Sequence, residues 1–152
     1  MSDDFRHRTS VQVRFRDVDA FGHVNNAVVS TYVEQARITY LRDVLAVDPV
    51  GRMPLILGMI KLDYLSPIFL EDELEVGSRV DWIGNASIAM SHLVRAVAAN
   101  AGRDARDLAR ATSVLVAYDY DQASPMPVPG DWRTALAAHE GRSLAKPTQG
   151  AS

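Results

Sequence analysis

One long helical segment dominates the sequence, and nearly every other regular segment has the pattern of a strand. Between Asn26 and about Leu45 there is no proline or glycine. Apolar residues recur there at three- and four-residue steps, at Val29, Val33, Ala36, Tyr40 and Val44. The other side also carries apolar groups, Val28, Tyr32 and Leu41, so we expect a helix that is covered on more than one face. Asn25 or Asn26 can cap its start. The sequence therefore predicts a central helix.

The remaining regular segments alternate with the period of a half-buried strand. The alternation is clearest at 73–83, which places Leu74, Val76, Val80 and Trp82 inward. Another segment shares an inner face made of Ile88, Met90, His92, Val94 and Ala96. The other expected strands are 9–15, with Val11, Val13 and Phe15 on one side, a strand through Ile60, Leu62 and Tyr64, and 108–120. A strand, one long helix and a run of antiparallel strands predict the α+β class.

The length of 152 residues fits one domain with a single core. We expect residues 1–152 to form this one domain, with an ordered core at about 9–140. A short helix is predicted at 131–139, after the proline-rich stretch SPMPVPGDW. From residue 141 to residue 152 we expect a flexible tail.

Charge and composition exclude several functional classes. Lys and Arg number 16 and Asp and Glu number 19, so the basic excess that nucleic-acid binding requires is missing. The absence of cysteine excludes disulfides, a thiolate nucleophile and cysteine-based metal sites. The polar N-terminus has no apolar signal segment, and no stretch is long and apolar enough to span a membrane. We therefore expect a soluble cytoplasmic protein with neither a nucleic-acid nor a membrane partner.

Polar groups concentrate in the segment RDVDAFGHVNN, residues 16–26, between the first strand and the helix. A helix N-terminus offers unpaired backbone N–H groups and the positive end of the helix dipole. It can therefore stabilise a carbonyl oxygen that gains negative charge. A carboxylate in the loop before such a helix can attack that carbonyl or activate a water beside it. Acyl transfer to water is the reaction that this arrangement suits.

The sequence FRDVDAFGHVNNAVVSTYVEQARITYL resembles the hotdog-fold thioesterases of the 4-hydroxybenzoyl-CoA thioesterase and acyl-CoA thioesterase type. The similar features are D-x-D, GHVNN and E-x-x-R in this order, followed by KLDYLSPIFLEDELEV (61–76) and VLVAYD (114–119). The resemblance covers roughly residues 9–121. It implies a hotdog fold, in which a curved antiparallel sheet wraps a long central helix. It also implies hydrolysis of a fatty or aromatic acyl-CoA without cofactor or metal, by a homodimer or a dimer of dimers.

The resemblance assigns roles to individual residues. Asp19 matches the family's catalytic acid, which acts as nucleophile or as general base. His23 and Val24 lie where backbone amides polarise the thioester carbonyl, Gly22 belongs to the same turn, and Asn26 begins the helix. Glu34 matches a carboxylate that is catalytic in some relatives and structural in others. Gly58 and Met59, together with the segment 53–64 that contains them, are expected to line the acyl or pantetheine channel.

Other interpretations of these residues stay open. Asp19 could be a turn residue, His23 a structural histidine, and Glu34 with Arg37 an ordinary ion pair within the helix. Asp17, Asp19 and His23 could hold a metal, but such spacings are common in loops and no metal site is predicted. His92 fits a hydrogen-bonded core or pocket-lining histidine. At the level of function, the alternatives are an acyl-ACP thioesterase and a binding module that holds acyl-CoA without turnover.

Overall fold

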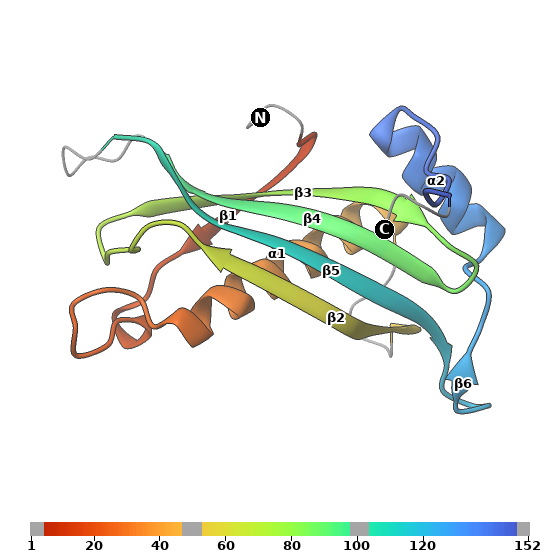
Figure 1. Cartoon of the computed structure of the whole chain (residues 1–152), viewed down its shortest axis with the longest axis horizontal. Coiled ribbons are helices and arrows are strands. Elements are labelled where there is room, and N and C mark those ends of the chain that lie inside the picture. The colour runs from red at the N-terminus through yellow and green to blue at the C-terminus, as the bar shows by residue number, and fades with distance from the viewer. Residues whose placement is uncertain (1–4, 47–52, 98–103, 149–152) are drawn as a thin grey trace.

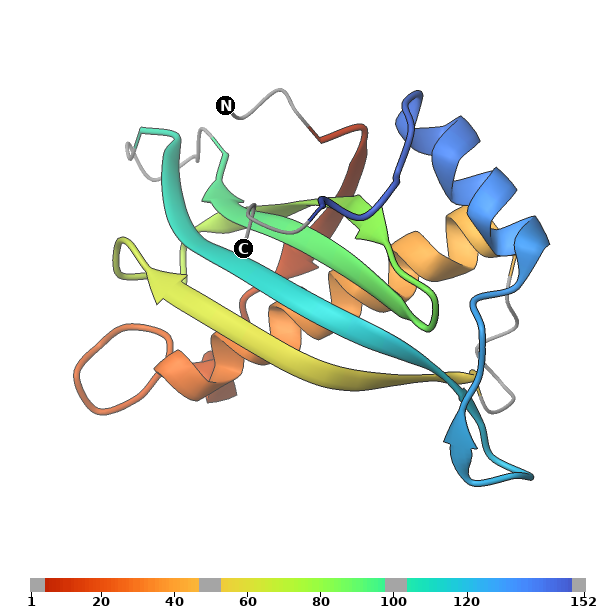
Figure 2. The ribbon, with the colours of Figure 1, turned by 45° about the vertical axis from the view of Figure 1, so that its right-hand side comes forward.

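The computed structural model describes residues 5–46, 53–97 and 104–148. Their regular elements are β1 (His7–Gln12), a 3₁₀ helix (Phe15–Asp17), α1 (Asn26–Leu45), β2 (Leu55–Tyr64), β3 (Glu73–Ile83), β4 (Ser87–Ala96), β5 (Arg106–Asp119), β6 (Ser124–Pro125) and α2 (Gly130–Glu140). The main strands form one antiparallel sheet in the order β1-β3-β4-β5-β2, and the short β6 pairs with β5. Helix α1 crosses one face of this sheet, and α2 lies beyond the far end of α1 (Figure 1 and Figure 2). The predicted α+β class is confirmed.

Helix α1 has the bounds that its sequence predicts. The side chain of Asn25 caps the first turn by accepting a hydrogen bond from the N–H of Ala27 at 2.9 Å. The predicted inner residues Val29, Val33, Ala36 and Tyr40 are buried against the sheet. Tyr32 and Leu41, on the other predicted apolar side, are buried as well, so the helix is covered on more than one face.

The inner face of the sheet follows the predicted alternation, with two local corrections. Trp82 was expected to point inward, but a β-bulge between Val80 and Trp82 makes Asp81 an extra residue, and Ile83 is buried instead. Phe15 was expected to continue the first strand on its inner side. The strand ends at Gln12, a 3₁₀ helix begins at Phe15, and that side chain is 83% exposed.

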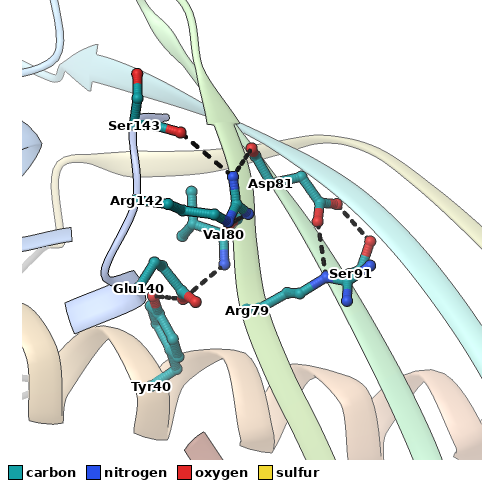
Figure 3. A network of polar contacts seen from close by, with 8 residues as sticks. All are labelled: Tyr40, Arg79, Val80, Asp81, Ser91, Glu140, Arg142 and Ser143. Carbon is teal, nitrogen blue, oxygen red and sulfur yellow. Dashed lines mark hydrogen bonds and ion pairs between the residues drawn. The ribbon is translucent and has the colours of Figure 1, made fainter. Parts of the chain in front are cut away.

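The β1 edge of the sheet is completed by the C-terminal part of the chain (Figure 3). Strand β1 pairs with β3 only as far as Ser78. Beyond that point the Glu140 carboxylate accepts a hydrogen bond from the N–H of Val80 at 3.0 Å, and Arg142 donates to the carbonyl of Val80 at 2.8 Å. The N–H of Ile83 then donates to the carbonyl of Leu144, whose side chain is buried. The C-terminal segment thus contacts β3 through Arg142, Leu144, Ala145 and Lys146, where a flexible tail was expected from residue 141. Residues 149–152 of that predicted tail lie outside the described residues.

The opposite edge, formed by β2, is open in the described part of the chain. This strand pairs with β5 alone, and Ile56, Leu57, Met59 and Tyr64 are large, exposed hydrophobic side chains. A bulge at Gly58 lies between the paired residues Leu57 and Met59. It keeps the apolar residues Leu57 and Ile60 both on the inner side, where Leu57 pairs with the buried Leu115 and Ile60 with the buried Ser113.

Candidate active site

A tight turn connects β1 to the start of α1. Val18 and Val24 form an isolated antiparallel bridge, and the N–H of Asp19 donates to the carbonyl of His23 at 3.0 Å. Within this bridge the N–H of Gly22 donates to the carbonyl of Asp19 at 3.1 Å. Gly22 has φ +88°, in the left-handed region that favours glycine. The predicted polar segment is therefore a closed loop with a glycine at its tip.

The first carboxylate of D-x-D, Asp17, is buried and structural. It accepts hydrogen bonds from the hydroxyl of Tyr32 at 2.7 Å and from the N–H of Arg14 at 2.9 Å. Burial raises the pKa of Asp17. The hydrogen bonds from Arg14 and Tyr32 and the nearby charges of Arg14 and Arg16 lower the pKa by more than burial raises it, so the net pKa lies below its ordinary value. These contacts tie the loop to α1.

The second carboxylate, Asp19, is half-buried and held by one hydrogen bond. Its Oδ1 accepts the N–H of Phe21 at 2.9 Å, which is a side-chain turn within the loop. No contact of the other carboxylate oxygen with a described residue is seen. Asp19 is thus oriented, and one oxygen is left for chemistry.

A cavity of about 240 Å³ opens beside this turn, between the start of α1 and the end of β2. His23, Val24 and Asn26 line it from the turn and the helix, and Tyr64, Ser66 and Ile68 line it from β2 and the segment that follows. The hydroxyl of Tyr64 donates to the carbonyl of Asn26 at 3.1 Å, which fixes the two walls to each other. Asp19 does not line the cavity, but its backbone N–H is hydrogen-bonded to the carbonyl of His23, which does.

The backbone donors at this cavity differ from those expected. The N–H of Val24 donates to the carbonyl of Ile68 at 2.7 Å, so it is not available to polarise a substrate carbonyl. This corrects the role expected for Val24. Neither the N–H of His23 nor that of Asn26 is hydrogen-bonded to another described residue. These two groups are the donors that a carbonyl oxygen in the cavity could use.

The remaining predicted site residues lie further along α1 and β2. Glu34 is largely exposed, with its carboxylate 3.9 Å from the guanidinium of the buried Arg37. Gly58 and Met59 lie in the middle of β2 and do not line the cavity beside Asn26. His92 is buried, and its Nδ1 is 2.9 Å from the hydroxyl of Ser78. Within one chain, the predicted residues of the turn lie together at the start of α1, whereas Gly58, Met59 and Glu34 lie away from them.

Tyr64 ends the segment 53–64, which was expected to line the channel, whereas Ser66 and Ile68 had no expected role. A signal was present, because the DYLSP run belongs to the motifs that carry the resemblance. Within the described ranges there is no group of three or more His, Cys, Asp or Glu side chains that could hold a metal ion. No helix of that part of the chain is long and apolar enough to cross a membrane.

The chain is similar to known proteins over most of its length. The model of the thioesterase-like superfamily matches residues 13–136. A thioesterase from Thermus thermophilus, whose crystal structure is complexed with coenzyme A and zinc, is 38% identical. It superposes with a TM-score of 0.80 over 93% of this chain and 99% of its own, which confirms the predicted hotdog fold.

Two curated proteins match over a shorter range. The uncharacterized protein YsmA of Bacillus subtilis (strain 168) is 27% identical over 89 residues, which is 59% of this chain and 60% of YsmA. The chloroplastic acyl-acyl carrier protein thioesterase ATL3 of Arabidopsis thaliana is 30% identical over 91 residues, which is 58% of this chain and 48% of ATL3. The chain thus spans only about half to three-fifths of these two relatives.

Proposed function

The chain belongs to the thioesterase-like superfamily, and from this premise we propose that it hydrolyses an acyl-CoA thioester to a free acid and coenzyme A. One arrangement carries the proposal: the oriented carboxylate of Asp19 lies near two backbone N–H groups in the sequence, one in the same turn and one at the first residue of α1. Neither N–H has a hydrogen-bond partner among the described residues. These N–H groups belong to His23 and Asn26, which line a cavity at the start of α1. Thioester hydrolysis needs two parts: hydrogen-bond donors that stabilise the negative charge on the carbonyl oxygen, and a base.

In the proposed reaction the carbonyl oxygen of the thioester accepts hydrogen bonds from the N–H groups of His23 and Asn26. Asp19 removes a proton from a water molecule, whose oxygen attacks the carbonyl carbon and forms an oxyanion. When the oxyanion collapses, the carbon–sulfur bond breaks and coenzyme A leaves as a thiolate that takes up the proton. Alternatively Asp19 itself attacks the carbonyl carbon and expels coenzyme A as a thiolate, and water then attacks the aspartyl carbonyl of the resulting mixed anhydride. A single turnover in H₂¹⁸O distinguishes the routes, because only the second places the label in the Asp19 carboxylate.

We also propose that two chains pair through their β2 edges. The β1 edge is completed by Glu140, Arg142 and Leu144, whereas the β2 edge is open and carries exposed apolar side chains. Unpaired strand edges of this kind tend to be covered in native proteins. Pairing would place β2 of one chain, with Gly58 and Met59, beside the partner, where these residues can contribute to a shared acyl channel. A dimer of such dimers stays an expectation from the family resemblance.

The activity is tested by assaying a panel of acyl-CoA thioesters with a thiol-reactive dye that reports free coenzyme A. We expect turnover of at least one aliphatic or aromatic acyl-CoA, and we expect Asp19→Asn to abolish most of it. The same acyl groups on acyl carrier protein are run in parallel, because the plant relative acts on that carrier by name. Binding of acyl-CoA by calorimetry without any release of coenzyme A would favour the non-catalytic binding module instead.

A further inference from the structure

A second cavity, of about 270 Å³, lies between α1 and the open side of β2, away from the turn that carries Asp19. Most of its walls are apolar, with Ile38 and Leu41 from α1, Leu57 from β2, and Met53 just before that strand, and the charged residue Glu34 lines it from α1. Arg37 lines it as well, and lies eleven residues after Asn26, or about 16 Å along the helix axis. The cavity is therefore separate from the proposed carbonyl site of the same chain.

The guanidinium of Arg37 is poorly satisfied where it stands. The residue is 5% exposed, and its Nη1 is buried without a hydrogen-bond partner among the described residues. Its Nη2 is 3.9 Å from a carboxylate oxygen of Glu34, too long for a hydrogen bond, and the Glu34 side chain is 60% exposed. Burial lowers the pKa of Arg37, and the charge of Glu34 opposes this effect only in part. A buried cation in this state is costly unless an acceptor reaches it.

The interior beneath Arg37 contains further unpartnered polar atoms. The Nε2 of His92 and the hydroxyl of Ser113 are buried without a partner in the described chain. Both residues belong to the sheet that α1 covers, and Ser113 is two residues before Leu115, which lines the cavity. An apolar cavity with a buried guanidinium at its edge fits one kind of ligand best. The planar fork of an arginine matches a carboxylate, and the apolar walls match a hydrocarbon chain or ring.

We propose that this cavity binds a carboxylate carried on an apolar chain, with Arg37 as the residue that recognises the carboxylate. The carboxylate of the ligand can come from two sources, and only the choice between these sources rests on the proposed function. The first source is the free acid that thioester hydrolysis releases, which would bind as a product. The second is the distal carboxylate of an acyl group that is itself a dicarboxylic acid.

Calorimetric titration of the full-length protein with octanoate and with 1-octanol tests the site without any need for turnover. We expect octanoate to bind the wild type at least about tenfold more tightly than it binds Arg37→Met, because a charged hydrogen bond is lost. The affinity for 1-octanol should change by less than about threefold, since the apolar walls remain. Equal octanoate affinities in the two proteins, or no octanoate binding to the wild type, would overturn the proposal.

Two further variants keep the result independent of folding. Glu34→Gln removes the carboxylate that competes for Arg37 and should strengthen octanoate binding several-fold, opposite in sign to Arg37→Met. Met53→Ser shortens an apolar wall at a half-buried position and should weaken octanoate and 1-octanol alike. Thermal melting of each variant shows that it is folded. Weakening of octanoate by all three substitutions would indicate general damage and contradict a role in recognising a carboxylate.

The source of the ligand is decided by kinetics with octanoyl-CoA and suberoyl-CoA, which share chain length but differ in the distal carboxylate. If the acyl group supplies the carboxylate, Arg37→Met raises KM for suberoyl-CoA at least about tenfold and leaves that for octanoyl-CoA nearly unchanged. If the released acid supplies the carboxylate, Arg37→Met leaves both KM values unchanged and weakens inhibition by octanoate instead. Absence of hydrolysis across the whole acyl-CoA panel, these two thioesters included, would reject the proposed function, while the calorimetric result on the site would still stand.

Discussion

The hydroxyl of Tyr32 donates to the buried carboxylate of Asp17 at 2.7 Å, so the two carboxylates of D-x-D have opposite surroundings. Asp17 is bonded to α1 and to the N–H of Arg14, whereas Asp19 lies half-buried at the rim of the turn. Residues two apart in the sequence therefore divide the work. One holds the loop against the helix, and the other is available for chemistry.

This division predicts different outcomes for two identical substitutions. Asp19→Asn keeps the shape of the side chain and the acceptor for the N–H of Phe21, but it cannot act as base or nucleophile. We expect kcat to fall by a factor on the order of 10²–10⁴, with little change in the melting temperature. Steady-state rates on the best acyl-CoA measure the effect.

The matched control is Asp17→Asn. Here we expect a loss of about 1–3 kcal/mol in the free energy of unfolding, because a charged acceptor of two hydrogen bonds is replaced. The rate per folded molecule should fall at most a few-fold. If Asp17→Asn were inactive while folded and Asp19→Asn retained the wild-type rate, the assignment of the catalytic carboxylate would be wrong.

The turn at Gly22 gives a second prediction. A Cβ added there would meet no atom within 4 Å, so we expect the cost of Gly22→Val to come from its φ of +88°. That cost is about 1–3 kcal/mol and is relieved by moving the turn. Displacement of the N–H of His23 should reduce kcat by a larger factor than the loss of folded protein, followed by the melting temperature, can explain.

Gly130→Val is the matched control for crowding. A Cβ added there also meets nothing within 4 Å, and Gly130 does not have a positive φ. Activity should stay at the wild-type level. Full turnover by Gly22→Val would show that the turn does not hold the donors for the carbonyl oxygen.

The open β2 edge predicts a dimer. Light scattering on the purified protein at micromolar concentration should give twice the mass of one chain. Met59→Lys places a charge on an exposed residue of this edge and should shift the equilibrium toward the monomer, with a parallel loss of activity. A fully active monomer of the wild type would contradict a site shared between two chains.

Local sequence was enough to predict the parts of this fold that depend on periodicity. The helix 26–45 and the strand 73–83 have the predicted bounds, since spacing and a cap at Asn25 define them without long-range contacts. The bulge at Asp81 could not be predicted from the local sequence, because the hydrogen bonds of Glu140 and Arg142 that accompany it come from the far end of the chain. The same holds for Val24, whose N–H is used by Ile68. Likewise, nothing in the EQAR run shows that Arg37 lacks a hydrogen-bond partner for Nη1.

Glu140 gives a fourth prediction, because its buried carboxylate accepts both the hydroxyl of Tyr40 and the N–H of Val80 (Figure 3). Glu140→Ala leaves both donors without an acceptor and should lower the free energy of unfolding by about 2–3 kcal/mol. Chemical denaturation measures this loss. Thr134→Ala, at an exposed position of the same helix, should change stability by no more than about 0.5 kcal/mol. Equal effects of the two substitutions would show that the C-terminal segment does not complete the sheet edge.

His92 predicts how stability depends on pH. Burial, aided by the charge of Arg37, lowers the pKa of His92 to about 3, from an ordinary value of 6.5. The unfolded chain therefore binds a proton below pH 6.5 that the folded chain does not. The stability contribution of this neutral imidazole is complete above pH 6.5 and is lost as the pH falls toward 3, by up to about 1.4 kcal/mol per pH unit. His92→Gln has no titrating ring but can still accept a hydrogen bond from Ser78. Denaturation at a series of pH values should show a shallower acid decline for this variant than for the wild type, and parallel curves between pH 6 and pH 4 would mean that His92 does not stay neutral in the folded protein.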